Sequence, residues 1–464
     1  MENMENMENM ETMENMENME PVENKETMDN GIPRRPNPRR RKRKTWKRIV
    51  RSYLPLAAVV LVIVLFIVFA VNSVKRSNEK RELERQESLA VEASIAQQQL
   101  DWEAEANALI VESEQYAISC EYDKAIEVLD RFSGNISDFP NLLSVRQSYE
   151  SGEANLVSWE DPTTIPFLSF SKFVVDPVTG FSGDNGSSNR VLYISCAEFT
   201  AILQQLYEND FMLVDLDDIF TTTKAEDGTT LIVKNDLRLP AGKKPIVLIQ
   251  CQPSGYENPL VVKDDGSFTT KITPAEGEPY YGSYDFVPLL EEFIASHPGF
   301  SLKGARAVLA VTGYKGLFGY PLEESETITK VADALKEAGY TLASNTYGNI
   351  AYSKADLTEL DDDLASWETA AAPLLGETEI LAYARSGDIS DGKGAYSSTS
   401  KKYEYTYSYG YKYYMGTCYN SNPWMSITDN TIRMGRIMVT GSNLKDSPKM
   451  FSNLFDAAKV YGTK

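Results

Sequence analysis

Histidine is almost absent from this chain. A single histidine, His297, occurs among the 464 residues, so a metal site that takes two imidazole ligands from one chain is excluded. His297 stands in the segment Ala295-Ser-His-Pro-Gly299, which is typical of the end of a helix, where the helix dipole favours it. We therefore predict a structural place for His297 rather than a role in catalysis.

Cysteine is scarce too. The four cysteines show none of the spacings of zinc motifs, and in a chain of this length they do not make a disulfide framework. We predict that each is a small buried hydrophobic residue. They are Cys120, Cys196, Cys251 and Cys418.

Positive charge is in short supply. Lysine and arginine total 46 against 67 acidic residues, for a formal net charge of −21. Eleven of the basic residues lie in residues 34–51, so the remainder is more acidic still. A surface of this sign does not bind nucleic acid or another anionic polymer through bulk charge.

Long apolar runs are limited to the stretch Leu54–Val71, eighteen residues without a charge. As a helix it is ~27 Å long, enough to cross a bilayer core with help from its flanks. The basic run before it keeps the N-terminus in the cytoplasm, with Trp46 and Tyr53 at the interface. A signal peptide cleaved near Val68 and Ala70 is the alternative. We predict a signal anchor in a bacterial cell membrane, with the chain after Asn72 outside the cell.

This anchor divides the chain. The Met-Glu-Asn repeat at the start cannot bury a core, which predicts a disordered cytoplasmic tail with its basic cluster over residues 1–51. The transmembrane anchor covers residues 52–74 and contacts the lipid bilayer through residues 54–71. Residues 75–158 are predicted to form a helical stalk and hairpin, and residues 159–464 a single large domain.

Helical periodicity marks the stalk and hairpin. Residues 80–99 form a charged, solvated pattern, and helices are expected over residues 104–119, 121–132 and 141–155. The stretch Tyr122-Asp-Lys-Ala-Ile resembles the second helix of a tetratricopeptide hairpin. One such hairpin is too small to hold a peptide in a groove, so we interpret it as a spacer packed against the next domain.

After Pro162, short apolar runs alternate with amphipathic helices, which predicts an α/β fold with a closed (β/α) barrel. Its chemistry is expected at the C-terminal ends of the strands. The predicted strands are 165–170, 245–249, 305–311, 341–343, 380–384, 411–415 and 432–439. The predicted helices are 196–208, 286–296, 325–338, 360–375 and 451–457.

Five blocks in this region carry a family resemblance. Residues 160–461 resemble the polysaccharide deacetylases, also called NodB-homology or carbohydrate esterase family 4 proteins, and more narrowly their membrane-anchored bacterial relatives. The resemblance depends on the order and spacing of the blocks together. The blocks are Cys196–Val214, Gly242–Leu248, Gly282–Phe293, Ala310–Tyr314 and Ala334–Tyr340.

The resemblance implies a divalent metal held by one aspartate and two histidines, beside an aspartate that serves as base. At the matching positions this chain has Cys251 for the base, Gln252 for the metal-binding aspartate, and Asn345 and Asn349 for the histidines. Neutral amides bind transition metals weakly. We therefore expect no metal and no other cofactor. Ser171 replaces a further histidine that many relatives carry at the end of the first barrel strand.

Several other positions are candidates for ligand binding. The resemblance places Arg385 and Asp388 at the barrel mouth, where they either bind an anionic or amide group or form an exposed ion pair. Tyr419 and Trp424 follow on a loop above the mouth, either to stack on sugars or to serve as a lid. Tyr256 is a further candidate. The segment 433–436, Arg-Met-Gly-Arg, fits the relatives without a known role.

In the tyrosine-rich segment, periodicity and resemblance disagree. Six tyrosines alternate strictly from Tyr403 to Tyr413, which by itself indicates a strand. The family pattern places a helix up to Ser408, Gly410 just after it, and a strand from Tyr411. We predict the helix, because a long strand here would delete one helix of the barrel.

Two functions remain open. The first is a pseudoenzyme, tethered to the membrane, that binds a cell-wall glycan or a protein partner. The second is an active hydrolase with Cys251 as nucleophile, which needs a base or an electropositive neighbour. The resemblance also places Cys251 and Cys418 at two strand ends, so a disulfide between them is an alternative to packed thiols.

Overall fold

The computed structural model describes residues 46–252, 258–274 and 276–463, with side chains from residue 54 onward. Residues 1–45 of the predicted tail, the side chains of Trp46 and Tyr53, and Tyr256 lie outside the described residues. The chain forms two compact units, Met1–Ala93 and Ser94–Lys464.

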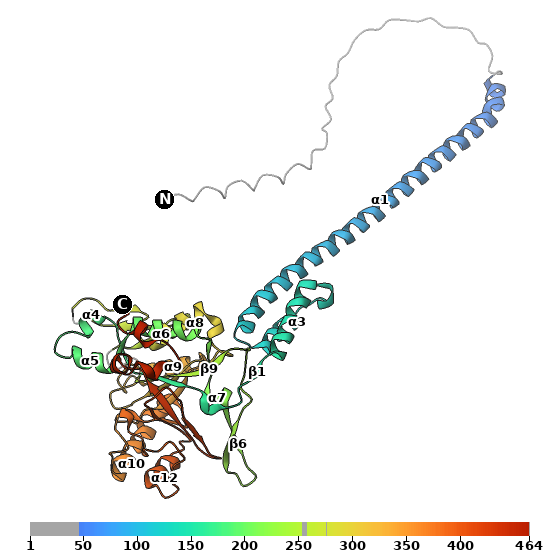
Figure 1. Cartoon of the computed structure of the whole chain (residues 1–464). Coiled ribbons are helices and arrows are strands. Elements are labelled where there is room, and N and C mark those ends of the chain that lie inside the picture. The colour runs from blue at the N-terminus through green and yellow to red at the C-terminus, as the bar shows by residue number, and fades with distance from the viewer. Residues whose placement is uncertain (1–45, 253–257, 275, 464) are drawn as a thin grey trace. The chain divides into compact units, whose positions relative to one another are not determined.

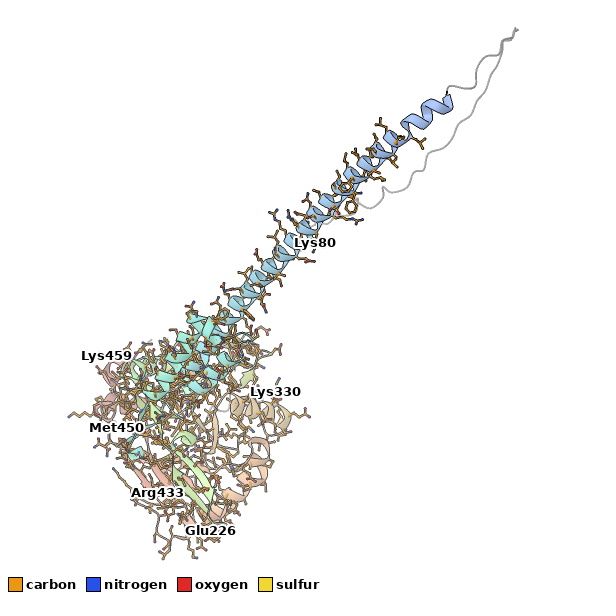
Figure 2. All side chains as sticks on the ribbon, turned by 90° about the vertical axis from the view of Figure 1, so that its right-hand side faces the viewer. Lys80, Glu226, Lys330, Arg433, Met450 and Lys459 are labelled. Atoms are coloured by element: carbon orange, nitrogen blue, oxygen red, sulfur yellow. The ribbon has the colours of Figure 1, made fainter. Side chains whose placement is uncertain are left out.

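The described part of the first unit is helical and belongs to α1 (Trp46–Ile118). The side chains of the apolar stretch from Leu54 to Val71 stand off this helix, and all of them are exposed (Figure 2). By length and composition this helix is able to cross a membrane. A signal sequence near an N-terminus meets the same criteria, so the helix alone does not decide between anchor and signal peptide.

In the second unit, the end of α1 packs with α2 (Tyr122–Asp130) and α3 (Pro140–Ala154). The three helices share a small apolar core. The backbone N–H of Lys303 donates to the carbonyl of Ser119 at 2.6 Å, which ties these helices to the barrel. The contact agrees with a spacer packed on the next domain. The core residues are Ala106, Leu109, Ala125, Val128, Leu129, Phe132, Leu142 and Tyr149.

The largest element of the second unit is a closed barrel (Figure 1). Among the described residues, seven strands form a ring in the order β13–β14–β15–β16–β18–β2–β9, and β9 pairs back with β13. Every pair in this ring is parallel. The strands are β2 (Phe167–Phe170), β9 (Lys244–Cys251), β13 (Val308–Val311), β14 (Thr341–Ser344), β15 (Ile380–Ala382), β16 (Tyr413–Cys418) and β18 (Ile432–Met438).

All seven predicted strands correspond to ring strands, and the predicted (β/α) barrel is confirmed. Alternation along each strand separates the core inside the barrel from the apolar clusters outside it. On β9, Val247, Ile249 and Cys251 belong to the core that fills the barrel, whereas Ile246 and Leu248 face the surrounding helices. The barrel interior is therefore packed with side chains, as in other closed parallel barrels.

Helices cover the outside of the ring. α6 begins with a capping box in which Ser195 and Glu198 satisfy each other's backbone N–H groups. The helices of this layer are α4 (Pro177–Gly180), α5 (Gly186–Leu192), α6 (Cys196–Glu208), α8 (Phe286–Ser296), α9 (Ser325–Glu337), α10 (Leu357–Ser366), α11 (Ala372–Leu375), α12 (Lys401–Ser408), α13 (Gly441–Asp446) and α14 (Ala457–Val460). The short helix α7 (Leu216–Ile219) instead adds two residues to the core that fills the barrel.

Short antiparallel additions to the barrel were not predicted. A hairpin of β6 (Phe220–Lys224) and β7 (Thr230–Lys234) packs Phe220 and Ile232 into the barrel core beside Ile432, the first residue of β18. It therefore closes the N-terminal end of the barrel. A three-stranded sheet, β10 (Leu260–Val262), β11 (Phe268–Ile272) and β12 (Tyr280–Gly282), is inserted between β9 and α8.

The remaining strands are short. β5 (Phe211–Leu213) pairs with the first part of β9, outside the ring, and β17 (Met425–Ile427) is antiparallel to β18. Two further pairs complete the set. These are β1 (Val157–Ser158) with β8 (Arg238–Leu239) and β3 (Phe173–Val174) with β4 (Ile194–Ser195).

One predicted helix is wrong. In place of a helix over residues 451–457, a 3-10 turn ends at Phe451, and α14 begins only at Ala457. The side chain of Asp456 accepts from the N–H of Ala458 and so starts the new helix. The prediction for the tyrosine-rich segment is confirmed, because α12 ends at Ser408 and Gly410 has a φ of 94°.

Candidate functional site at the barrel mouth

The barrel mouth is the set of C-terminal strand ends, opposite the β6–β7 hairpin. Its floor is formed by Cys251 on β9, Ser169 on β2 and Arg436 on β18. Arg436 shares an inward face with Met434, and its Nη1 donates to Cys251 Sγ at 2.8 Å. Ser169 Oγ lies 3.6 Å from the same sulfur. A cation therefore touches the residue that matches the family's catalytic base.

The guanidinium of Arg436 is held on three sides. Its Nη2 donates to the carbonyl of Tyr383 at 2.7 Å, and its Nε donates to the carbonyl of Gly416 at 3.2 Å. The residue is only 1% exposed. Within the part of the chain that the structure describes, no carboxylate forms an ion pair with it. A buried charge without an opposite charge is costly, so its presence calls for a reason.

Gln252 follows Cys251 in a left-handed conformation, with a φ of 60°. Its backbone N–H donates to the carbonyl of Ala310 at 2.8 Å, and its side chain is half-buried. Non-glycine residues pay a steric penalty in this region, and such penalties gather at functional sites. Other positive-φ residues at strand ends of the mouth are Thr346, Asn349, Arg385 and Ser386.

Asn345 is buried at the end of β14. Its Nδ2 donates to the carbonyl of Ala382 at 2.6 Å, so its amide links two neighbouring strand ends. Asn349 lies four residues further along and is half-buried. The two asparagines that match the family's histidines are thus on one loop, and the first of them is used to hold backbone.

Asp363 on α10 holds this loop. Its carboxylate accepts from the N–H groups of Tyr347 and Gly348 at 2.9 and 2.6 Å, and from the hydroxyl of Tyr352 at 2.7 Å. Burial raises the pKa of Asp363, while these three donors lower it in part. Sequence reasoning missed Asp363, because nothing in a charged helix distinguishes the one aspartate that turns inward.

Asp388 is paired, but not with Arg385. Its Oδ2 accepts from Arg433 Nη2 at 2.9 Å, and its Oδ1 accepts from the hydroxyl of Tyr396 at 2.9 Å. Arg385 is exposed on the same loop. Burial and the charge of Asp388 raise the pKa of Tyr396 well above its usual value, so Tyr396 stays a neutral donor. The alternative of an exposed pair between Arg385 and Asp388 is therefore wrong.

The two aromatic candidates have different surroundings. Tyr419 is 73% exposed on the loop after β16. Trp424 is half-buried against Gly435, where a side chain would collide with the indole ring, and the Arg433 guanidinium lies 5.6 Å from that ring. Ser171 is half-buried just after β2. Tyr419 is thus the candidate with a ring face open to a ligand.

All four cysteines are free, so the alternative of a bridge between Cys251 and Cys418 is not realised. Cys418 points out of the barrel, into the core under the helices, and donates to the carbonyls of Asn420 and Asn422 at 3.3 Å. Cys196 is half-buried, and burial, followed by the charge of Asp285, raises its pKa to about 12. Burial also raises the pKa of Cys120.

These residues do not fit the divalent metal that the resemblance implies. The sulfur of Cys251 contacts a guanidinium, and Asn345 presents its N–H group to backbone. The described residues contain no group of three or more histidine, cysteine, aspartate or glutamate side chains able to hold a metal ion. His297 is the C-cap of α8, stacked 4.3 Å from Phe293, at the helix end that faces away from the mouth.

Arg436 is the residue of the mouth that sequence reasoning left without a role. Ile432, Met434 and Arg436 alternate along β18, and the first two lie in the core that fills the barrel. That alternation is the signal that would have placed the arginine inside.

Comparison with known proteins gives a distant likeness. No protein-family model and no curated protein matches the chain. It is similar to the structure of the Streptococcus pyogenes deacetylase PplD in complex with acetate, at 13% identity and a TM-score of 0.33, over 62% of this chain and 99% of that one. It is also similar to a protein described as a polysaccharide deacetylase from Mycobacterium smegmatis, at 13% identity and a TM-score of 0.21, over 29% of this chain and 41% of that one. Function has to be inferred from the chain's own residues.

Proposed function

We propose that this protein is a membrane-tethered pseudoenzyme of the polysaccharide deacetylase type. Its barrel mouth binds a cell-wall glycan or a protein partner and does not remove acetyl groups by a metal mechanism. The observation that carries the proposal is the contact between Arg436 and Cys251 at 2.8 Å, which puts a fixed cation against the position of the base.

The deacetylation chemistry of the family requires an anionic ligand for the metal and a base for the attacking water. Cys251 and Gln252 supply neither carboxylate, and Asn345 and Asn349 supply no imidazole. Without these groups a bound water keeps its high pKa, and the acetamide carbonyl is not polarised. Binding is then the activity that the mouth retains.

Exposed aromatic rings support a binding role. Tyr419 lies on the loop after β16, and Tyr280 and Tyr281 on β12 are 43% and 57% exposed. Since β12 belongs to the insertion between β9 and α8, it lies on the mouth side of the barrel. Aromatic rings beside strained backbone are a common way to build a ligand site.

A retention assay tests the binding role. The full chain, purified in detergent, is mixed with insoluble bacterial cell wall, and the bound fraction is measured for wild type, Tyr419→Ala and Val233→Ala. Val233 is 44% exposed on β7, at the opposite end of the barrel, and serves as the control. We expect Tyr419→Ala alone to lose retention several-fold. Retention that is equal in all three proteins points to a different surface, and no retention by wild type leaves the protein partner as the ligand.

The proposed absence of metal-dependent deacetylation is tested separately. Acetate release from an N-acetylglucosamine oligomer and bound zinc are measured on the same preparation. Stoichiometric zinc together with acetate release that a chelator abolishes would disprove the pseudoenzyme.

An active hydrolase with Cys251 as nucleophile is the second candidate. The positive charge of Arg436 favours it, because cations beside a sulfur promote nucleophilic chemistry. A guanidinium cannot take up a proton, however, so a base still has to be found. Hydrolysis of an acetyl ester that Cys251→Ser abolishes, and that no chelator affects, would establish this function in place of the first.

The orientation in the membrane is also a proposal. The apolar helix and the basic run before it favour an N-terminus in the cytoplasm and a barrel outside the cell. Protease added to intact cells should degrade residues 72–464 and spare an epitope at residues 1–30. An N-terminal epitope that is accessible reverses the orientation, and one that is missing from the mature protein indicates a cleaved signal peptide.

A further inference from the structure

We infer that the guanidinium of Arg436 is a permanent cation that takes the place of a divalent metal ion at the floor of the barrel mouth. Arg436 is on the inward face of β18, and its guanidinium touches Cys251 on β9, the carbonyl of Tyr383 after β15 and the carbonyl of Gly416 on β16. One side chain thus links β18 to β9, to β16 and to the residue after β15.

The charge of this group is fixed. A guanidinium stays protonated in proteins, and burial to 1% exposure keeps water from screening it. Within the described residues no carboxylate is paired with it. A divalent cation brought to the neighbouring Cys251 or Gln252 would therefore meet an unscreened like charge, whatever ligands were offered to it.

The surrounding polar groups are arranged around this cation. Cys251 Sγ and the two carbonyl oxygens accept from it, and the Asn345 amide donates to a carbonyl instead of presenting a ligand atom to a metal. The position that matches the base thus accepts a hydrogen bond from the guanidinium, and Asn345, one of the matched ligand positions, is used to hold backbone. It follows that the floor attracts anionic groups and repels cationic ones.

Alkylation of Cys251 measures this local charge directly. In both iodoacetate and iodoacetamide the sulfur bonds to the methylene carbon and displaces iodide, which leaves to solvent. The two reagents are nearly equal in size, but only iodoacetate is an anion. Because the protonation state of the sulfur affects both rates equally, their ratio reports the local charge alone. The rates are followed at each cysteine by peptide mass spectrometry on the full chain in detergent.

We expect Arg436→Met to lower the iodoacetate to iodoacetamide ratio at Cys251 at least fivefold, and Arg436→Lys to retain most of it. Cys196, half-buried outside the barrel, is the control within the same molecule, and its ratio should not change. A ratio at Cys251 that is the same in wild type and Arg436→Met would overturn the inference.

Zinc binding by three combined variants is a second test, and it does not require a reagent to reach Cys251. The four changes Cys251→Asp, Gln252→Asp, Asn345→His and Asn349→His are combined with Arg436 unchanged, with Arg436→Lys and with Arg436→Met. Zinc is measured by equilibrium dialysis, and folding by circular dichroism.

Among variants that fold, we expect the one with Arg436→Met to bind zinc at least tenfold more tightly than the other two. Equal zinc affinity in all three would overturn the inference, as would stoichiometric zinc at the mouth of the wild-type protein. If the combined variants do not fold, the alkylation ratio alone decides.

Discussion

Two arginines three residues apart on β18 have opposite surroundings. Arg433 faces out of the barrel, where its guanidinium pairs with Asp388 at 2.9 Å, donates to the carbonyl of Gly392 and lies 3.9 Å from the ring of Tyr396. Arg436 faces into the barrel, where it contacts a thiol and two carbonyls. The two side chains are about equally buried, at 2% and 1% exposure.

This difference indicates a structural role for Arg433 and a functional role for Arg436. Arg433 is a buried cation with a carboxylate partner and an aromatic ring beside it. Its ion pair with Asp388 holds the segment after β15 in place. A buried cation without a carboxylate contributes less to folding than its burial costs. Such groups persist where a site uses them, and the barrel mouth is where the strained residues Gln252, Thr346 and Asn349 also gather.

Removal of Asp388 is expected to have the largest effect on stability. Asp388→Ala leaves the buried Arg433 without its counter-ion, so we expect a loss of about 3–5 kcal/mol in the free energy of unfolding. Denaturant unfolding of the full chain measures it. Glu404→Gln, which breaks the exposed pair between Lys401 and Glu404, should cause no measurable change. An equally small effect at Asp388 would mean that the pair on the outer face is not structural.

The same contrast exists among carboxyl groups. Asp215, at the closed end of the barrel, accepts from the N–H of Arg306 at 3.3 Å without an ion pair in the described structure. Burial, followed by the charge of Asp218, raises its pKa from 3.8 to about 7. A raised carboxyl pKa means that the folded state binds more protons, so stability falls as the pH rises from about 4 to about 7.

We therefore expect Asp215→Asn to stabilise the protein at pH 8, by roughly 4 kcal/mol at most, and to have little effect at pH 4. Thermal melts of both proteins across that range test the sign. A variant that is less stable than wild type at pH 8 would show that the Asp215 carboxylate is favourably paired.

Arg436→Met tests the stability contribution of the arginine that faces into the barrel. It removes hydrogen bonds to two carbonyls but leaves no carboxylate behind, so it should cost less than about 2 kcal/mol in unfolding free energy. Arg433→Met should cost at least twice as much, because Asp388 is left buried and unpaired. Melts of the two variants side by side decide it, and equal costs would remove the distinction between the two arginines.

The barrel could be predicted from sequence because its strands are apolar runs with helices of the right length between them. The predicted run at residues 245–249, for instance, lies wholly inside β9, since both faces of a parallel strand are buried. The β6–β7 hairpin was not predicted, because β6 is mostly threonine and the apolar run on β7 is only three residues long. Residues 451–457 carry enough apolar positions for a helix, but Asp456 caps the start of a new helix, α14.

The candidate site could be predicted only in part. Matching positions identified Cys251, Gln252 and Asn345, which the structure places at the ends of β9 and β14, the two strands on either side of β13. They did not identify what replaces the metal, because the partner of Cys251 comes from residue 436, far along the chain. Nor did they show that Asp388 pairs with Arg433, since loop geometry, not spacing, brings those two side chains together.

The smallest expected effect concerns backbone strain at the mouth. Gln252 has a φ of 60°, a conformation that costs an L-residue with a side chain but not glycine. Gln252→Gly relieves this strain while it adds freedom to the unfolded chain, and the first effect is the larger in the left-handed region. We expect a gain of about 0.5–1 kcal/mol in unfolding free energy. Thr222→Gly, on the exposed strand β6 with ordinary backbone, should lose about as much. If both glycine variants are destabilised alike, Gln252 is not strained, and the mouth loses one of the features that distinguish it from the outer face of β18.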